Sequence, residues 1–396
     1  MATTFPTSLD TPLTNPTSTS PQSSPPHDVQ HTQANDSIAA LEAKVGVNNS
    51  TVTSSLDYRL GLMPGRNRLM NGNHVVRQRG NGTFTTSAYG IDGTTYFSTG
   101  STFVASAQAH PVAAIPGVKE SGYFHRVIVT SAAGASNLAN TRYAVEGVET
   151  LAGQVCTLSW YAKADAARPI ATEVVQSFGT GGAPSADVTA IGVYKPTLST
   201  SWARYTTTFT MPSITGKTLG SNGNSSVSIN FWFDAGSTYN ARTSTLGQQS
   251  GTFDIDMVQL EVGANATPFE FENPALTLAK CQRYFQTSYQ NVAIPTNTSG
   301  GYLFAPVGSA TLTNGFLIGH VIFRRTMRAT PTIQTYSYTS STTGVVSSAS
   351  GTDLTANSGV VNTVQPSGFI LYNNSGAAIT PNFGGFIFHW TASAEL

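Results

Sequence analysis

Charge is scarce in this sequence. Only 10% of its 396 residues are charged, and 20 basic residues balance 20 acidic ones. A nucleic-acid binder usually has a basic surface that replaces the counterions of phosphate groups. A helix that lies on a membrane surface usually has basic residues along its polar face. We therefore predict neither a nucleic-acid partner nor a membrane-surface role.

Long apolar runs and cysteines are also scarce. No run of about 18 or more apolar residues is present, so no membrane insertion is predicted. Residues 1–26 have neither the basic start nor the apolar centre of a secretory signal. Cys156 and Cys281 are too few for a disulfide framework. We predict two buried free thiols in a chain that folds in a reducing cytoplasm.

Small polar residues fill much of the remainder. The chain has 37 glycines and many serines, threonines and asparagines, and 39% of its residues are hydrophobic. This mixture favours many short strands joined by turns over a bundle of helices. The composition therefore predicts a mainly β protein with enough apolar residues for buried cores.

Two segments precede the strand-rich part. Residues 1–30 are rich in proline, serine and threonine and should not fold alone, so we interpret them as an extended attachment arm. Residues 31–65 are interpreted as a short helix and a linker. The helical stretch is HTQANDSIAALEAKVG, with Thr32 as its N-cap and Gly46 as its C-terminal stop.

Apolar residues of this helix recur at the spacing of a coiled-coil seam. They are Ala34, Ile38, Leu41 and Val45. A helix of about 15 residues is marginal in water by itself. No other helix adjoins it in sequence, so we predict that copies of the chain bury the seam against one another. The alternative is that the helix packs on its own β-domain.

Residues 66–272 have the alternation of strands that place one face in a core and one in solvent. The core face of QVCTLSWYA is formed by Cys156, Leu158 and Trp160. The core face of SVSINFWFDAG is formed by Val227, Ile229, Phe231 and Phe233. Its solvent face is expected to carry Ser228, Asn230, Trp232 and Asp234. Many short strands over this length predict a jelly-roll β-sandwich.

The remaining sequence reads as a connector and a second β-domain. Residues 273–287 are predicted to contain a short helix, with Asn273 as its N-cap and Pro274 at its first position. Residues 288–396 form strands separated by Gly- and Ser-rich turns and are interpreted as a smaller C-terminal β-sandwich domain. In its last strand Phe386, Phe388 and Trp390 alternate with Ile387 and His389.

Several blocks resemble bacteriophage tail-fibre and virion-appendage proteins. HTQANDSIAALEAKVG resembles a short helix near their N-termini, and RNRLMNGNHVVRQRGNGTFTTSAYGIDGTTYFSTG resembles the opening of a jelly roll like a carbohydrate-binding module. FDIDMVQLEVGANATPFEFENPALTLAKCQRYFQTSY resembles the close of that domain and its connector, and HWTASAEL resembles the chain end. The blocks follow the family's order. His74 stands where the family more often has an apolar or aromatic residue.

This resemblance implies an elongated homotrimer with its N-terminus on the particle and its C-terminus distal. The short coiled-coil helix would hold three chains in register, and threefold repetition of a weak contact raises avidity. The implied partners are the chain itself, a phage tail, baseplate or head protein bound through the arm, and a host surface polysaccharide. We expect the protein in the virion, assembled in the host cytoplasm.

Residues for bond cleavage are few. Many glycosidases use two carboxylates roughly 5–9 Å apart. Asp254 with Asp256, and Glu270 with Glu272, could reach that separation along a strand, but they lie in segments where the resemblance implies a structural role. Motifs of serine hydrolases, zinc proteases and phosphate-binding loops are missing, as is the short repeat of a parallel β-helix. We predict no enzymatic activity and keep a glycan depolymerase as an alternative.

A structural calcium site competes with simple turn chemistry at one end of the sandwich. Jelly rolls that bind carbohydrate often hold calcium between their first and last strands, and oxygen ligands suit this ion. The candidates are Asn71 and Asn73, predicted on the first strand, and Asp254 and Asp256, predicted on the last. The competing interpretation is that these groups belong to turns and edges. His27 and His31 are suitably spaced, but His27 follows two prolines, so no zinc site is predicted.

Glycan binding needs an aromatic ring that stacks on a sugar, with amides and carboxylates beside it. The best set in the sandwich is Trp232, Asn230, Asp234 and Tyr239. The alternative is that Trp232 packs against a loop or a neighbouring subunit, whereas Trp160 and Trp202 are expected to be structural. In the C-terminal domain, Tyr336 and Tyr338 share a strand face and are candidate receptor contacts.

Basic residues occur in two small clusters. They are Arg66, Arg68, Arg77 and Arg79, and then Arg324 and Arg325. With so little positive charge around them, we expect them to pair with acids or cap strands instead of binding phosphate.

Together these patterns predict a structural virion protein, a homotrimeric tail fibre or spike that adheres to host glycan without cleaving it. No cofactor is predicted apart from the calcium alternative. The alternative function is a purely structural head, collar or baseplate fibre that binds only other virion proteins.

Overall fold

The computed structural model describes residues 27–47, 50, 52, 54–61, 64–111, 114–115, 122–289, 292–295, 302–306, 317–354, 356–376 and 385–396. It divides into two compact units. The first comprises Met1–Asn67 and Asn265–Glu270, and the second comprises Arg68–Ala264 and Phe271–Leu396. Most of the predicted attachment arm therefore lies outside the described residues.

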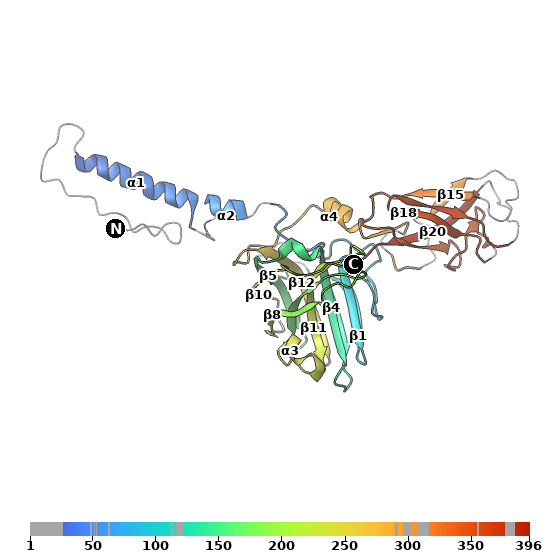
Figure 1. Ribbon diagram of the computed structural model, residues 1–396, viewed down its shortest axis with the longest axis horizontal. Coiled ribbons are helices and arrows are strands. Elements are labelled where there is room, and N and C mark those ends of the chain that lie inside the picture. Colours follow the sequence, from blue (N-terminus) through green and yellow to red (C-terminus); the bar gives the residue numbers. More distant parts are fainter. Residues whose placement is uncertain are drawn as a thin grey trace. The chain divides into compact units, whose positions relative to one another are not determined.

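The described residues of the first unit form the helices α1 (His27–Val45) and α2 (Leu56–Gly61) (Figure 1). Helix α1 begins at His27, so Thr32 lies inside it and the predicted N-cap is wrong. The predicted stop is confirmed: Gly46 has a φ of 85°, and its N–H donates to the carbonyl of Glu42 at 2.8 Å.

Apolar side chains of α1 are left in solvent. Ile38 is 51% exposed and Leu41 is 63% exposed. Leaving such residues exposed forgoes the stabilisation of burying them, roughly 1.5–3 kcal/mol for a fully buried side chain of this size. Three of the four predicted seam residues, Ala34, Ile38 and Leu41, are thus exposed in the described part of the first unit, whereas Val45 is half-buried.

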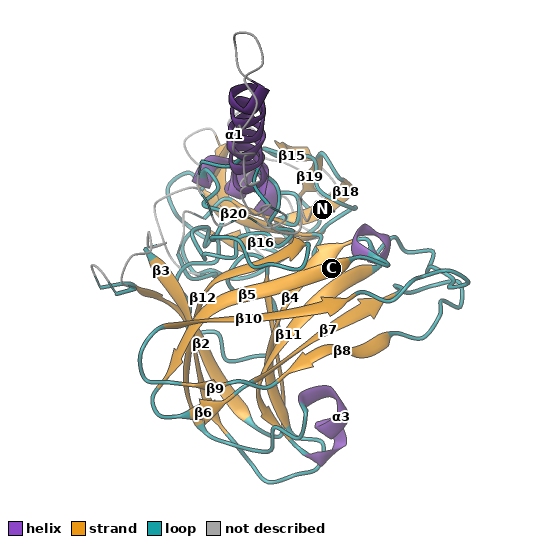
Figure 2. Cartoon of the chain, turned by 90° about the vertical axis from the view of Figure 1, so that its left-hand side faces the viewer, coloured by secondary structure: helices purple, strands orange, loops and turns teal. Residues whose placement is uncertain are grey.

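Two five-stranded antiparallel sheets form a β-sandwich in the second unit (Figure 2). The first sheet has the order β1 (Thr94–Thr99), β4 (Leu138–Glu146), β11 (Ser226–Ala235), β7 (Ala171–Ser177) and β8 (Val188–Tyr194). The second has the order β10 (Ala203–Thr210), β5 (Val155–Ala164), β12 (Gly251–Val262), β3 (Tyr123–Thr130) and β2 (Thr102–Ala109). A short pair, β6 (Arg168–Pro169) and β9 (Thr197–Leu198), accompanies them. The prediction of a mainly β fold with a sandwich is confirmed.

The core of the sandwich lies between these sheets. Cys156, Leu158 and Trp160 of β5 meet Val227 and Phe231 of β11 in one buried cluster. Trp160 packs edge-on against Phe231, with ring centroids 5.3 Å apart. Both core faces predicted from alternation are therefore correct. Cys156 and Cys281 are buried free thiols, as predicted.

Alternation was misleading for the other face of β11. All ten residues of this strand are buried, including those expected to face solvent. The outer face is covered by a short helical segment, η2 (Ser237–Tyr239) and α3 (Asn240–Thr243), which packs on β7, β8 and β11. A further short helix, η1 (Val148–Leu151), contacts β4 and β11.

The segment before β1 is not a strand, in contrast to the prediction for Asn71 and Asn73. It runs as turns, and Asn71 and His74 both have a φ of 55°. Its backbone still docks on β12 at the register shift between Asp256 and Gln259, where the N–H of Val258 donates to the carbonyl of Gly72 at 2.9 Å. Left-handed residues break the regular pairing that a strand requires.

A short helix connects the sandwich to the C-terminal sheets. Helix α4 (Pro274–Cys281) is capped as predicted, since the side chain of Asn273 accepts from the N–H of Ala275 at 2.9 Å. One sheet of the C-terminal region is built on β20 (Gly385–Ser393), which pairs with β13 (Phe285–Thr287), β14 (Leu303–Pro306), β16 (Thr332–Ser337) and β17 (Ser347–Ser348). The other has the order β15 (Leu317–Ile322), β19 (Gly368–Tyr372) and β18 (Val360–Gln365).

The C-terminal sheets enclose a second core. Phe386, Phe388 and Trp390 of β20 pack with Phe369 of β19, as the alternation predicted. The sandwich and these sheets fall within one compact unit, so the predicted boundary at residue 288 stays a prediction. No helix of the described residues is long and apolar enough to cross a membrane.

Candidate functional site

The predicted sugar platform is closed in this structure. Trp232 is only 1% exposed, and its ring packs against Tyr239 at 5.1 Å and beneath the guanidinium of Arg242 at 5.1 Å. The expectation of a solvent-facing indole is therefore corrected, in favour of packing against an adjacent loop. The structure does bring Trp232, Asn230 and Tyr239 together on the outer face of the first sheet.

A buried carboxylate organises this face. Glu173 of β7 lies opposite Asn230 and has no exposed side-chain surface. Its oxygens accept from the Asn230 amide at 3.0 Å, the Trp232 indole at 3.1 Å and the Arg242 guanidinium at 3.0 Å. These four side chains satisfy one another, which is what allows so polar a face to be buried.

Asp234 belongs to a separate polar network. Its carboxylate accepts from the hydroxyls of Ser101 at 2.6 Å and Ser131 at 2.8 Å, and from the N–H of Gln249 at 2.7 Å. Asp234 thus joins loops at the end of the sandwich through a network separate from that of Glu173.

The predicted calcium ligands have protein partners. Asn71 donates to the carbonyls of Val76 and Asp92, each at 2.8 Å. Asp254 binds Arg126 through both carboxylate oxygens. The side-chain oxygen of Asn71 also accepts from the N–H of Val76 at 2.9 Å, so Asn71 and Asp254 are both engaged with protein groups. Asn73 is half-buried. In the described part of the chain, no group of three or more His, Cys, Asp or Glu is arranged to hold a metal ion.

Asp256 takes part in a buried histidine cluster. Its carboxylate meets His110 at 2.8 Å and His74 at 3.4 Å, and the other nitrogen of His74 meets the Tyr143 hydroxyl at 2.9 Å. His125 lies 5.6 Å from the ring of His74. Burial lowers the pKa of His125 well below its usual value, and the neighbouring His74 adds to this effect. The cluster is buried, and it provides hydrogen-bond partners for His74, which stands where the resembling family more often has an apolar or aromatic residue.

The other carboxylate pair also has structural contacts. Glu270 accepts from the N–H groups of Gly65 at 2.6 Å and Asn67 at 2.8 Å. Glu272 accepts from Thr277 at 2.9 Å and from Lys280 at 2.5 Å, within the connector helix. Glu270 and Glu272 therefore bind two different sets of hydrogen-bond donors.

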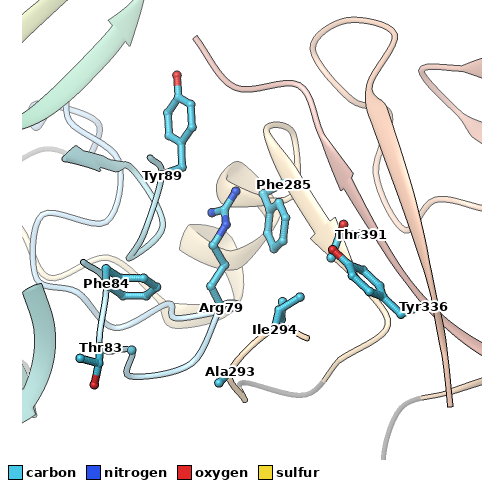
Figure 3. A pocket seen from close by; sticks show the side chains of 10 residues that line it. Arg79, Thr83, Phe84, Tyr89, Phe285, Ala293, Ile294, Tyr336 and Thr391 are labelled. Atoms are coloured by element: carbon cyan, nitrogen blue, oxygen red, sulfur yellow. The ribbon is translucent and has the colours of Figure 1, made fainter. Parts of the chain in front are cut away.

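A pocket of about 350 Å³ lies beside the C-terminal sheet. It is lined by Arg79, Gly82, Thr83, Phe84, Tyr89, Phe285, Ala293, Ile294, Tyr336 and Thr391. We call it the junction pocket, because the sandwich, β13 and the C-terminal strands all contribute to it. Figure 3 shows Arg79 beside the ring of Phe285, with Phe84 and Tyr89 to one side and Ile294 and Tyr336 to the other. Its size and aromatic lining suit a small organic ligand.

Arg79 is held firmly at this pocket. Its guanidinium stacks on Phe285 at 3.5 Å from the ring centre and binds the carboxylate of Glu395 at 2.8 Å. Tyr89 donates its hydroxyl to the carbonyl of Leu396. Residues 395–396 therefore lie against the sandwich, because β20 runs back toward the connector and pairs with β13.

Tyr336 lines the pocket, and Tyr338 belongs to the same aromatic cluster through the buried rings of Tyr289 and His389. Tyr336 packs edge-on against Tyr289 at 5.9 Å, and Tyr338 packs edge-on against Tyr302 at 5.1 Å. Tyr289 and Tyr338 both stack on the buried His389, at 4.1 and 6.3 Å. The structure thus brings both predicted receptor tyrosines into one aromatic cluster.

Sequence reasoning missed most of the pocket. Phe84, Tyr89 and Phe285 gave no periodic signal that would separate them from core residues. Arg79 was noticed only as part of a basic cluster, and its pairing with an acid agrees with the expectation for that cluster. Arg66 caps backbone in the first unit by donating to the carbonyl of Pro268 at 2.7 Å, whereas Arg324 and Arg325 have exposed side chains.

Comparisons with known proteins give structural likenesses only. No family model and no curated protein matches the sequence. The enzymatically active domain of tailspike protein 4 of bacteriophage CBA120 is 16% identical, with a TM-score of 0.29, over 51% of this chain and 22% of that one. The family 11 carbohydrate-binding module of the Clostridium thermocellum cellulase Lic26A-Cel5E is 15% identical, with a TM-score of 0.30. The match covers 47% of this chain and 98% of that one.

A third likeness is to TmCBM61 in complex with β-1,4-galactotriose. It is 10% identical, with a TM-score of 0.25, over 50% of this chain and all of that one. At such low TM-scores these likenesses do not decide what this chain binds.

Proposed function

We propose that the chain is one subunit of a homotrimeric bacteriophage appendage that adheres to host surface glycan without cleaving it. The glycan part is carried by the junction pocket, where the predicted receptor residue Tyr336 stands with three further aromatic rings. Sugar rings present apolar faces that stack on such side chains, and their hydroxyls need nearby polar groups.

The proposal that the chain is homotrimeric rests on exposed apolar residues of α1. Ile38 and Leu41 are exposed in the single chain, and self-association would bury them. β-Branched residues at one seam position with leucine at the other also suit two strands. The resemblance to tail-fibre helices is what selects three.

Sedimentation of the full-length protein tests the assembly. We expect three chains for the wild type and single chains for Leu41→Gln, because glutamine keeps helix propensity but removes the apolar contact. Ala40→Gln, on the exposed part of the helix outside the seam, is the matched control and should stay trimeric. A wild type that sediments as a single folded chain would refute the assembly, and two chains would refute the trimer.

Incubation with a panel of bacterial surface polysaccharides tests adhesion. We expect binding with no change in polymer length. A fall in polymer length would establish the depolymerase alternative. Absence of binding to every polymer would favour a fibre that contacts only virion proteins.

A further inference from the structure

Among the described residues that line the junction pocket, Arg79 is the charged one. Its other polar side chains are hydroxyls, from Thr83, Tyr89, Tyr336 and Thr391. A free guanidinium in such a place would select carboxylate-bearing sugars, since it matches a carboxylate with two parallel hydrogen bonds. Whether Arg79 is free therefore decides which class of sugar the pocket accepts.

Arg79 is not free to bind an anion. Its Nη2 binds Glu395, and the two side chains are only 13% and 8% exposed. A second buried carboxylate, Asp92, also acts on the Arg79 charge and is itself held by Gln78 at 2.7 Å. An incoming carboxylate would lose its hydration and then meet Glu395 at close range. Like charges at such a distance disfavour binding strongly.

Neutral polar contacts remain in the pocket. Thr83 is exposed and Tyr336 is half-buried, and both line the pocket with a hydroxyl. A hydroxyl donates to and accepts from sugar hydroxyls without any charge. The rings of Phe84, Tyr89 and Tyr336 supply apolar surfaces for the sugar face.

We propose that the junction pocket binds a neutral pyranose unit of the host glycan, and that Glu395 sets this specificity by occupying Arg79. The inference rests on the proposed adhesion function and adds its sugar class. The remainder of the glycan runs toward the exposed Tyr302, which packs against Tyr338 at 5.1 Å.

Matched sugar pairs test the class directly. The full-length protein is titrated with glucose and glucuronate, and with galactose and galacturonate, which differ only in the carboxylate. We expect the neutral member of at least one pair to bind roughly tenfold or more tightly, the factor that 1.4 kcal/mol provides. A preference for the acidic member would overturn the proposal.

Glu395→Gln tests the specificity residue. Glutamine keeps an acceptor for Arg79 but removes the negative charge, so the neutral-to-acidic preference should fall by roughly tenfold. Glu272→Gln, which removes a carboxylate from another ion pair outside the pocket, is the control and should keep the wild-type preference. An unchanged preference in Glu395→Gln would remove its assigned role.

Thr83→Trp tests the location. Thr83 is exposed at the pocket wall, so a bulky replacement can fill the pocket without disturbing a core. Binding of both sugars should be lost while the melting temperature is kept, and Tyr336→Ala should weaken both sugars equally. If both variants still bind polysaccharide as tightly as the wild type does, the junction pocket is not the sugar site, but the proposed adhesion function is retained. If the wild type binds no polysaccharide, adhesion itself fails.

Discussion

At the scale of single residues, Glu173 shows how a polar strand face becomes interior. Its carboxylate has no exposure, whereas the side chain of its partner Arg242 is 30% exposed. A buried charge is tolerated only with a partner and further hydrogen bonds. Asn230 and Trp232 supply those bonds.

Because of this difference in exposure, replacing Arg242 and replacing Glu173 should lower the unfolding free energy by different amounts. Arg242→Gln leaves a fully buried carboxylate unpaired and is expected to cost about 3–5 kcal/mol of unfolding free energy. Glu173→Gln leaves a guanidinium that can turn toward water, so its cost should be smaller. Urea unfolding of both variants measures the difference. Equal costs would contradict this account.

His125 should make stability depend on pH. Burial lowers its native pKa below the usual 6.5, so the unfolded chain binds the proton more readily. Its stabilising contribution is complete above about pH 6.5 and falls as the pH drops, by roughly 1.4 kcal/mol per pH unit until the native pKa is reached.

The variant His125→Phe removes this titration and keeps a ring beside Tyr96, which lies 5.3 Å from His125. Thermal unfolding between pH 4.5 and 7.5 should show a flatter profile for the variant than for the wild type. A profile of the same slope would assign the pH dependence to other groups.

At the scale of elements, α4 is a short helix whose start is set by one side chain. The carbonyl oxygen of the Asn273 side chain satisfies the N–H of Ala275, which has no partner within the helix. Pro274 follows at the first helical position, where its missing N–H costs nothing. The residue types alone explain why the helix starts here.

Asn273→Ala is expected to lower the unfolding free energy by about 1 kcal/mol, because the N–H of Ala275 loses its acceptor. Asn273→Asp retains an acceptor and should stay within a few tenths of the wild type. Denaturant midpoints of the two variants give the comparison. A destabilised Asp variant would show that the amide nitrogen of Asn273 matters instead.

At the scale of the whole molecule, binding strength should depend on assembly. A trimer that presents three junction pockets to one polymer binds with avidity, without any new contact. Single chains made by Leu41→Gln should keep the affinity of the wild type for a monosaccharide. Their affinity for the polysaccharide should fall by on the order of 10²–10⁴. Surface binding assays with polymer and monosaccharide check both values, and an equal loss for both ligands would point to damage in the pocket.

Local patterns determined a large part of this protein. Alternation placed Trp160 and Phe231 in the sandwich core and Phe388 in the second core. The stop at Gly46 and the cap at Asn273 followed from backbone chemistry that needs only neighbouring residues. These features depend on contacts within a few positions or on the strict period of a strand, so the sequence was sufficient for them.

Tertiary structure decided which polar groups are buried and where a pocket forms. Asn230 and Trp232 look solvent-facing along their own strand, but Glu173 and Arg242 arrive from β7 and α3 and enclose them. Arg79 and Glu395 are 316 positions apart, and no local period relates them. Burial and charge pairing are properties of surfaces that meet only after folding, so they were fixed by the packing and not by any local pattern.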